Sequence, residues 1–402
     1  MSGGNRVMQK SALSEKNLYS KFSKLIGKLV ATEPGVQYAP LYYKPLEKVK
    51  EIQLGKHKGN YDSFFTIPHS LHSSLEWWIS NLPLCYKKVS QGPPKLVLYS
   101  DASKLGWGAY NKNDNVRTGG EWSIVEQSLH INILELKAFQ FTILTFCKDI
   151  SDKHVRVFTD NTTTCSYVNC LGGKKHELNA LARDIWFWCI ARNIHISAAH
   201  VPGEQNSEAD EQSRTVNDDL EWALKSKIFQ SVEIRFPGIS IDLFASRLNH
   251  KTPQYVSRKP DPNALAIDAF ALTWTDHLYY IFPPFSLIPR ILQKIEEDEA
   301  EAVLVAPIWP TQCWWPNLLR IIMDQPIRLP NPQRILFLPH KPDRIHPLKK
   351  LKLGVFHVSG RSFAEEVSQK WRANSYSNPG GTVPKGSMTH ISKNGLNFVD
   401  LT

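Results

Sequence analysis

Apolar residues recur at helix spacing in two stretches near the start of the chain. The first stretch follows a possible cap at Ser14 and carries Leu18, Phe22, Leu25, Ile26 and Leu29. The second covers residues 70–82 and places Leu71, Leu75, Trp78 and Ile79 on one face. We therefore expect residues 1–92 to form a small helical segment.

After Gln91-Gly92-Pro93-Pro94 the apolar period changes to that of strands. Three short strands, separated by Gly, Asn and Asp, are predicted at 95–100, 107–111 and 116–122 and favour an antiparallel meander. The pattern then predicts, in order, a long helix at 132–149, a strand at 155–159, helices at 162–171 and 177–192, a strand at 194–200 and a short helix. This order indicates an α/β domain over residues 93–218 with a five-stranded mixed sheet.

A second α/β pattern follows. It predicts strands at 239–244, 278–282 and 302–306 and helices at 286–297 and 314–323, which favours a separate unit over residues 228–335. Beyond Pro330 the chain is rich in Pro, Lys and Ser, so we expect residues 336–402 to be a flexible basic and polar tail.

Composition adds one hint about partners. With 42% hydrophobic and 21% charged residues, the 402-residue chain has a globular composition that excludes wholesale disorder. The formal net charge is +10, and Lys and Arg gather at 44–58 and 334–352. Nucleic acid as a polyanionic partner fits this charge, and a solvated basic surface fits it equally well.

Other classes of protein are not indicated. The six cysteines contain no CxxC pair, so zinc is not expected. No stretch approaches the roughly 20 apolar residues of a membrane span, and the start Met1-Ser2-Gly3-Gly4 does not look like a signal peptide. We expect a reducing, intracellular setting, in the cytoplasm or the nucleus, and no membrane partner.

Four acidic residues stand at the ends of predicted elements. Asp101 ends the first strand, Glu135 lies in the first turn of the long helix, Asp160 ends the fourth strand, and Asp210 opens the short helix. If the first and fourth strands are adjacent and parallel, Asp160 lies beside Asp101. A lone Asp at a strand end is most often a turn or cap residue. Cleavage of a phosphodiester, however, needs an activated water, a stabilised leaving oxygen and neutralised charge, which two divalent ions about 4 Å apart can supply, and Mg²⁺ prefers such oxygen ligands.

The order Asp101, Glu135, Asp160 and Asp210, with the elements between them, resembles the RNase H family, and the run from His200 to Asp210 is similar to its retroelement branch. The resemblance implies that four carboxylates hold two Mg²⁺ ions, which Mn²⁺ can replace, and that RNA paired to DNA is hydrolysed to 3′-hydroxyl and 5′-phosphate ends. Asp101 would bridge both ions, Glu135 and Asp160 would face the leaving group and substrate, and Asp210 would bind the ion that activates water.

Three further residues are candidates. By the same resemblance, His200 matches a mobile histidine that assists proton transfer or product release, and the alternative is that it fixes the turn after its strand. Asn132 and Asn161 could hydrogen-bond nucleic acid, and helix capping suits both equally well. No residue is predicted to bind an organic cofactor.

The resemblance extends to the flanking regions. Residues 35–43 and 59–62 are similar to the sequence after the palm of DIRS-like retrotransposon reverse transcriptases, which implies a thumb- or connection-like segment that contacts duplex. No Tyr-x-Asp-Asp motif is found, so we do not expect this chain to synthesise DNA. A polymerase palm and a recombinase would be partners from the same kind of polyprotein.

The second unit is similar to the DNA adenine methyltransferase-like domain of these elements. Asp242-Leu243-Phe244-Ala245-Ser246 stands where a strand would meet the cofactor, and Phe282-Pro283-Pro284-Phe285 where the amine-binding motif would stand. Active enzymes carry Asp, Asn or Ser before the two prolines to accept hydrogen bonds from the target amine, and Phe282 cannot do so. We therefore expect a degenerate unit.

The sequence favours an enzyme, a metal-dependent ribonuclease H that acts on RNA–DNA hybrids. Two alternatives stay open. One is a catalytically dead retroelement remnant that only binds nucleic acid, and the other is S-adenosylmethionine-dependent DNA methylation by the second unit.

Overall fold

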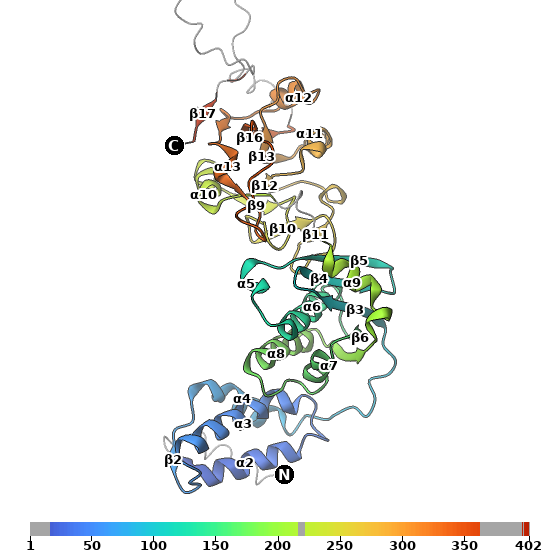
Figure 1. Cartoon of the computed structure of the whole chain (residues 1–402), viewed down its shortest axis with the longest axis vertical. Coiled ribbons are helices and arrows are strands. Elements are labelled where there is room, and N and C mark those ends of the chain that lie inside the picture. Colours follow the sequence, from blue (N-terminus) through green and yellow to red (C-terminus); the bar gives the residue numbers. More distant parts are fainter. Residues whose placement is uncertain (1–16, 216–221, 362–395, 397, 402) are drawn as a thin grey trace, which may run out of the picture. The chain divides into compact units, whose positions relative to one another are not determined.

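The computed structural model describes residues 17–215, 222–361, 396 and 398–401. The chain folds into two compact units, coloured by sequence in Figure 1. The first holds the residues up to Arg117 together with Leu129–Ser213, and the second holds Thr118–Ser128 and the residues from Arg214 on. The finer boundaries at 92, 218, 228 and 335 stay predictions.

The first unit begins with packed helices. These elements are β1 (Asn17–Leu18), α2 (Tyr19–Ala31), α3 (Ala39–Lys56), β2 (Phe64–Phe65), η1 (His69–Leu71) and α4 (His72–Asn81). Helices α2 and α4 lie where the apolar spacing predicts them, and the expected cap at Ser14 lies outside the described residues. Helix α3 is not predicted, because Pro45 and several lysines obscure its apolar positions. Its Tyr43 and Leu46 are nevertheless buried against α2 and α4.

A five-stranded sheet follows in the order β5-β4-β3-β6-β7. Its strands are β3 (Leu96–Ala102), β4 (Gly106–Asn111), β5 (Val116–Glu121), β6 (His154–Thr159) and β7 (His195–His200). Strand β3 pairs antiparallel with β4 and parallel with β6, and β6 pairs parallel with β7. The predicted mixed sheet is confirmed, including the parallel neighbours β3 and β6.

The helices that follow in this unit are α6 (Ile131–Phe146), α7 (Thr162–Asn169), α8 (His176–Ile190), η2 (Gly203–Gln205) and α9 (Ser207–Arg214). The short helix α5 (Ile124–Gln127), between β5 and α6, clusters with the second unit instead. Helix α6 packs on β3 and β4, and α7 and α8 pack on β7. The core between them contains Leu98, Phe139, Val157 and Trp186, and Leu41 of α3 is buried in the same cluster.

The second unit contains an eight-stranded sheet in the order β11-β10-β9-β12-β13-β16-β14-β17. Its strands are β9 (Ile239–Asp242), β10 (Gln254–Ser257), β11 (Ala266–Ile267), β12 (Leu278–Ile281), β13 (Glu301–Pro307), β14 (Ile327–Arg328), β16 (Leu353–Ser359) and β17 (Val399–Asp400). The pairs from β11 to β13 are parallel, whereas β16 runs antiparallel to both β13 and β14.

The other elements of this unit are α10 (Ser226–Arg235), η3 (Ala269–Ala271), η4 (Phe285–Leu287), α11 (Ile288–Glu297), α12 (Trp315–Arg320), α13 (Pro332–Ile335) and the short pair β8 (Ala223–Leu224) and β15 (Leu336–Phe337). Buried apolar clusters lie on the sheet, one around Leu304 and Ile291 and another around Val303 and Phe229. The strands expected near 239, 278 and 302 are confirmed.

The expectation of a tail from residue 336 onward is wrong for residues 353–359. Strand β16 pairs with β13 along its whole length, and its Val355, Phe356 and Val358 are fully buried. The Lys- and Pro-rich residues before β16 dominate the local composition, so the composition does not reveal the apolar run of this strand. The backbone of β16 is hydrogen-bonded to the neighbouring strands. Residues 362–395, 397 and 402 lie outside the described residues.

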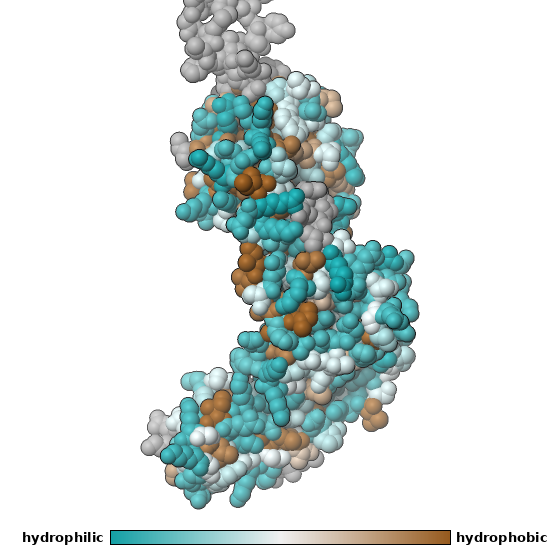
Figure 2. Space-filling view, in the orientation of Figure 1, coloured by the Kyte–Doolittle hydropathy of each residue, from teal (hydrophilic) through white to brown (hydrophobic). Residues whose placement is uncertain are grey.

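Two surface properties bear on the kind of protein. Within the part of the chain that the structure describes, no helix combines the length and the apolarity that a membrane crossing needs. On the face seen in Figure 2, hydrophilic residues cover most of the surface and apolar ones form small separate patches. Scattered apolar residues of this kind need no partner to cover them.

Candidate metal centre

Two aspartates lie at the same edge of the first sheet. Asp101 is the penultimate residue of β3, and Asp160 directly follows β6. The strands are parallel and pair Tyr99 with Phe158, so the chain brings both aspartates to neighbouring carboxyl ends. Asp101 is buried with 4% of its surface exposed, whereas Asp160 is exposed.

Helix α6 adds the third carboxylate. One carboxylate oxygen each from Asp101, Glu135 and Asp160 lies within 4.8 Å of the other two. Phe139 and Thr142 of the same helix are fully buried, which fixes the face that α6 turns to the sheet. The sheet and the helix thus gather three acidic groups that are far apart in sequence.

The surroundings of Glu135 disfavour the ionised form of its carboxyl group. Burial raises its pKa to about 9, and the charges of Asp101, Asp160 and, least, Asp210 add to this. Among the described residues its buried Oε2 atom has no hydrogen-bond partner. A cation bound among these carboxylates would favour the ionised form of Glu135, because it would replace the repulsion by the neighbouring charges with attraction.

Asn206 is a contributor that the sequence analysis misses. It is 1% exposed, and its Nδ2 donates to the Asp101 Oδ1 at 3.3 Å and to the Ser100 backbone oxygen at 3.1 Å. This amide therefore orients the Asp101 carboxylate, as groups behind metal ligands commonly do. The only sequence signal for this role is that Asn206 lies four residues before Asp210, in a loop with few apolar residues.

Asp210 lies on α9 and is not part of the group of three. Two contacts hold its helix in place. A Cβ on Gly108 of β4 would meet the Ala209 backbone oxygen at 2.0 Å, so only glycine permits this close approach. The Ser103 hydroxyl also donates to the Ser213 backbone oxygen at 2.6 Å. Asp210 is half-buried, and its charge still contributes to the raised pKa of Glu135.

His200 is the last residue of β7 and pairs in register with Thr159, the residue before Asp160. Its side chain is exposed. The loop that follows passes close to the acidic group, since a Cβ on Gly203 would lie 3.5 Å from the Asp160 Oδ2. The histidine therefore stands at the sheet edge that carries the carboxylates.

The two asparagines contact each other. Asn161 caps α7 by accepting from the Thr164 backbone N–H at 2.8 Å, so the capping alternative describes it well. Its Nδ2 donates to the Asn132 Oδ1 at 3.2 Å, and Asn132 donates to the Thr163 hydroxyl at 3.4 Å. Asn132 does not cap α6, because His130 holds that position.

The donor set fits a hard divalent cation. Its ligand atoms are all carboxylate oxygens, and they come from a strand, a helix and a strand end that the hydrophobic core fixes. The unpartnered Oε2 of Glu135 is the second observation that favours a cation here.

Comparison with known proteins finds a similarity for part of the chain. Residues 97–216 match the family model described as reverse transcriptase-like. No curated protein matches the chain.

Among solved structures, LC11-RNase H1 from compost, in complex with an RNA/DNA hybrid, is 20% identical over 29% of this chain and 93% of that chain, with a TM-score of 0.26. RNase H1 from Halobacterium salinarum is 17% identical over 29% and 92%, with a TM-score of 0.25. The foamy viral protease-reverse transcriptase in complex with double-stranded DNA is 15% identical over 50% of this chain and 41% of that chain, with a TM-score of 0.21.

Proposed function

We propose that this chain is a divalent-metal-dependent nuclease that hydrolyses the RNA strand of RNA–DNA hybrids. The observation that supports this is the meeting of Asp101, Glu135 and Asp160 within 4.8 Å at one sheet edge. The reverse transcriptase-like match over residues 97–216 agrees with it.

In this proposal Asp101, Glu135 and Asp160 hold Mg²⁺ or Mn²⁺, and Asp210 joins them as the fourth ligand. Two bound ions would activate water, neutralise charge on the phosphate and stabilise the leaving oxygen. The residues of the chain supply the rest. Asn206 orients Asp101, and the buried Glu135 would release its proton to solvent on binding a cation.

The remaining candidates serve the substrate. His200, exposed at the edge of the sheet, assists proton transfer or product release. Asn132 binds the sugar–phosphate backbone or bases, and Asn161 fixes its amide while capping α7. We further propose that the chain derives from a DIRS-like retrotransposon polyprotein, with polymerase and recombinase as partners and an intracellular setting. The overall basic charge suits a nucleic-acid substrate.

A cleavage assay tests the proposal. The full chain is incubated with a hybrid labelled on the RNA strand, with Mg²⁺ or Mn²⁺, and with a chelator in parallel. We expect cuts with 5′-phosphate ends that stop on chelation and in Glu135→Gln. The matched control Glu177→Gln, an exposed glutamate of α8, should keep full activity. Tight hybrid binding without cutting would instead support the alternative of a dead nucleic-acid-binding remnant.

One observation favours a second function in the other unit. From β9 the strands β10 and β11 continue to one side and β12 and β13 to the other, all parallel, which is the strand-order reversal where Rossmann-like sheets bind ligands. The loop after β9, Leu243-Phe244-Ala245-Ser246, lacks the glycines of a phosphate-binding turn, and Phe282 offers no acceptor for an amine. Titration of the full chain with S-adenosylmethionine tests whether the second unit binds this cofactor. Saturable binding would support a cofactor site, and none would leave the unit without methylation activity.

A further inference from the structure

The stretch Thr118–Ser128, called the connection below, belongs to the second unit. It comprises the last four residues of β5, helix α5 and the residues beside that helix, and it clusters with the chain from Arg214 on, although β5 and α6 form part of the sheet and helix layer of the candidate metal centre. Helix α6 therefore begins close in sequence to residues that the second unit holds.

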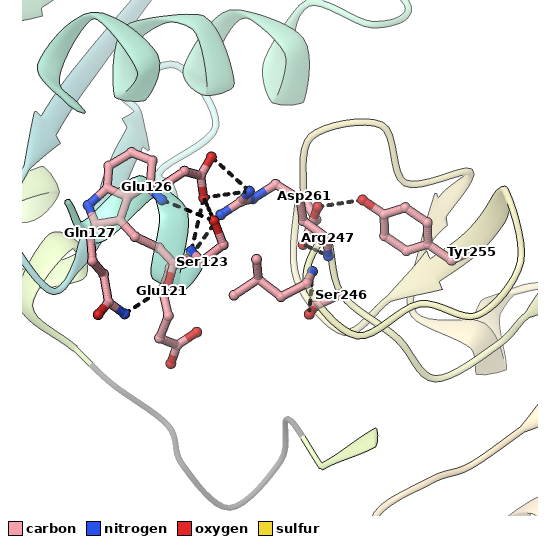
Figure 3. A network of polar contacts seen from close by, with 10 residues as sticks. Glu121, Ser123, Glu126, Gln127, Ser246, Arg247, Tyr255 and Asp261 are labelled. Atoms are coloured by element: carbon pink, nitrogen blue, oxygen red, sulfur yellow. Dashed lines mark hydrogen bonds and ion pairs between the residues drawn. The ribbon is translucent and has the colours of Figure 1, made fainter. Parts of the chain in front are cut away.

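Arg247, in the loop after β9, makes the main contacts to the connection (Figure 3). Its Nη1 donates to both carboxylate oxygens of Glu126, at 3.0 and 3.2 Å, and its Nη2 donates to the Glu121 backbone oxygen at 2.9 Å. Side-chain exposure is only 17% for Arg247 and 12% for Glu126. A planar guanidinium suits three such acceptors, and an ammonium group does not.

Both partners are themselves held rigidly. Glu126 forms a capping box with Ser123 at the start of α5, so its carboxylate is fixed to the connection's backbone. The Arg247 backbone N–H donates to Asp261 at 3.0 Å, and the Tyr255 hydroxyl donates to the same carboxylate at 2.7 Å, as Figure 3 shows.

Further contacts fasten the two ends of the connection. The Thr118 hydroxyl donates to the Pro260 backbone oxygen, and the Gln127 Nε2 donates to the His340 backbone oxygen at 3.3 Å. Thr118 and Trp122 are fully buried. The connection is therefore built into the second unit as a buried, polar and directional contact, unlike a solvated surface loop.

Helix α6 starts almost at once after this anchor. It begins at Ile131, and Glu135 lies four residues further on. Only Ser128, Leu129 and His130 separate the helix from the end of α5, and Lys104 Nζ donates to the Leu129 backbone oxygen at 2.7 Å. The first turn of α6 is thus only three residues away, along the backbone, from the segment that Arg247 holds.

We propose that Arg247 is a positioning residue for the metal centre, which holds the connection so that α6 presents Glu135 to Asp101 and Asp160. This inference rests on the proposed function, because it assigns the second unit a role in that site. It also predicts that the nuclease region depends on a residue of the unit that follows it.

The test compares variants of the full chain at a temperature where each is folded. Arg247→Met removes the guanidinium, and Arg247→Lys keeps one positive charge without the planar guanidinium group. Arg258→Met is the control at an exposed arginine. We measure Mn²⁺ affinity by calorimetry and hydrogen exchange of the backbone amides at 129–136. Both readouts are independent of catalysis, so they stand even if the wild type does not cleave hybrids.

We expect Arg247→Met to weaken Mn²⁺ binding about tenfold and to speed exchange at 129–136, as loss of an orienting group behind metal ligands does. Arg247→Lys should recover less than half of the effect on a logarithmic scale, and the control should match wild type. A purely structural role would lower the unfolding temperature and leave Mn²⁺ affinity and exchange at 129–136 unchanged, and that result would overturn the proposal. If Arg247→Met does not fold, Arg247→Lys alone decides by the same two measurements.

Discussion

The two large sheets of this protein each carry an aspartate at the carboxyl end of a parallel strand, with different surroundings. Asp101, near the end of β3, meets the carboxylates of Glu135 and Asp160. Asp242, at the end of β9, accepts from the backbone N–H groups of Lys251 at 3.0 Å and Phe244 at 3.4 Å. Both are buried, with 4% and 2% of their surface exposed.

The two aspartates differ in which groups surround the carboxylate. Around Asp242 the backbone of its own loop supplies donors, so the group serves the local fold. Around Asp101 other carboxylates converge, and burial and repulsion raise the pKa of the neighbouring Glu135. A strand-end aspartate becomes a candidate ligand where the fold adds like charge that only a cation compensates.

The largest expected effect comes from neutralising each aspartate in turn, which tests whether the two differ in function. Asp101→Asn should reduce hybrid cleavage about 1000-fold or more, because a carboxylate shared by the metal site is lost. Asp242→Asn should leave the cleavage rate within about twofold, since that group does not belong to the site. Rates are measured on the same hybrid under saturating Mn²⁺. Equal losses in both variants would contradict the distinction.

The next largest effect concerns the pH dependence of cation affinity, which the pKa of Glu135 determines. Its pKa of about 9 lies above the ordinary 4.5, so the folded protein holds a proton that the cation must displace. Cation affinity should therefore rise with pH, about tenfold per pH unit, or about 100-fold between pH 6 and 8. Calorimetric Mn²⁺ titrations at these pH values measure it. Glu135→Gln should bind more weakly and with little pH dependence, and an equally steep rise in that variant would count against the role of Glu135.

Removing the amide behind Asp101 should have a smaller effect. Asn206→Ala deletes one donor to the Asp101 carboxylate, and we expect Mn²⁺ affinity to fall about tenfold. Asn193→Ala is the matched control, because that exposed amide donates to Asp152 at 2.6 Å, a residue outside the group of three. Indistinguishable affinities for the two variants would show that Asn206 does not orient the ligand.

The smallest expected effect concerns Asp242. Burial raises its pKa from 3.8 to about 7, so its folded form holds the proton more tightly than the unfolded chain does. Stability is then lost as the pH rises from about 4 through 7, by roughly 2 kcal/mol between about pH 5 and 8. Asp242→Asn cannot ionise, and the unfolding midpoint in urea should depend less on pH in that variant. A steeper dependence in the variant than in wild type would be the opposite result.

The sequence predicts the carboxylate group better than it predicts what supports it. The parallel pairing of two strands suffices to expect that Asp101 and Asp160 meet, whereas the addition of Glu135 to them is what the family resemblance implies. Asn206 and Gly108 do not follow from such spacing, since their roles arise from tertiary contacts of the loop before α9 and of α9 itself.

The same limit applies to whole elements. Helix α3 and strand β16 are missed because lysines and prolines dominate their neighbourhoods, while their stability comes from burial against other elements. The assignment of residues 118–128 to the second unit also lies beyond any local pattern, because their contacts come from Arg247, Pro260 and His340, all more than a hundred positions away.

The most direct test of the central claim is anomalous X-ray diffraction from crystals of the full chain soaked in Mn²⁺. We predict a metal peak with one oxygen each of Asp101, Glu135 and Asp160 about 2.1 Å away. Crystals that show these three side chains ordered around no peak, with Mn²⁺ bound elsewhere, would contradict the assignment.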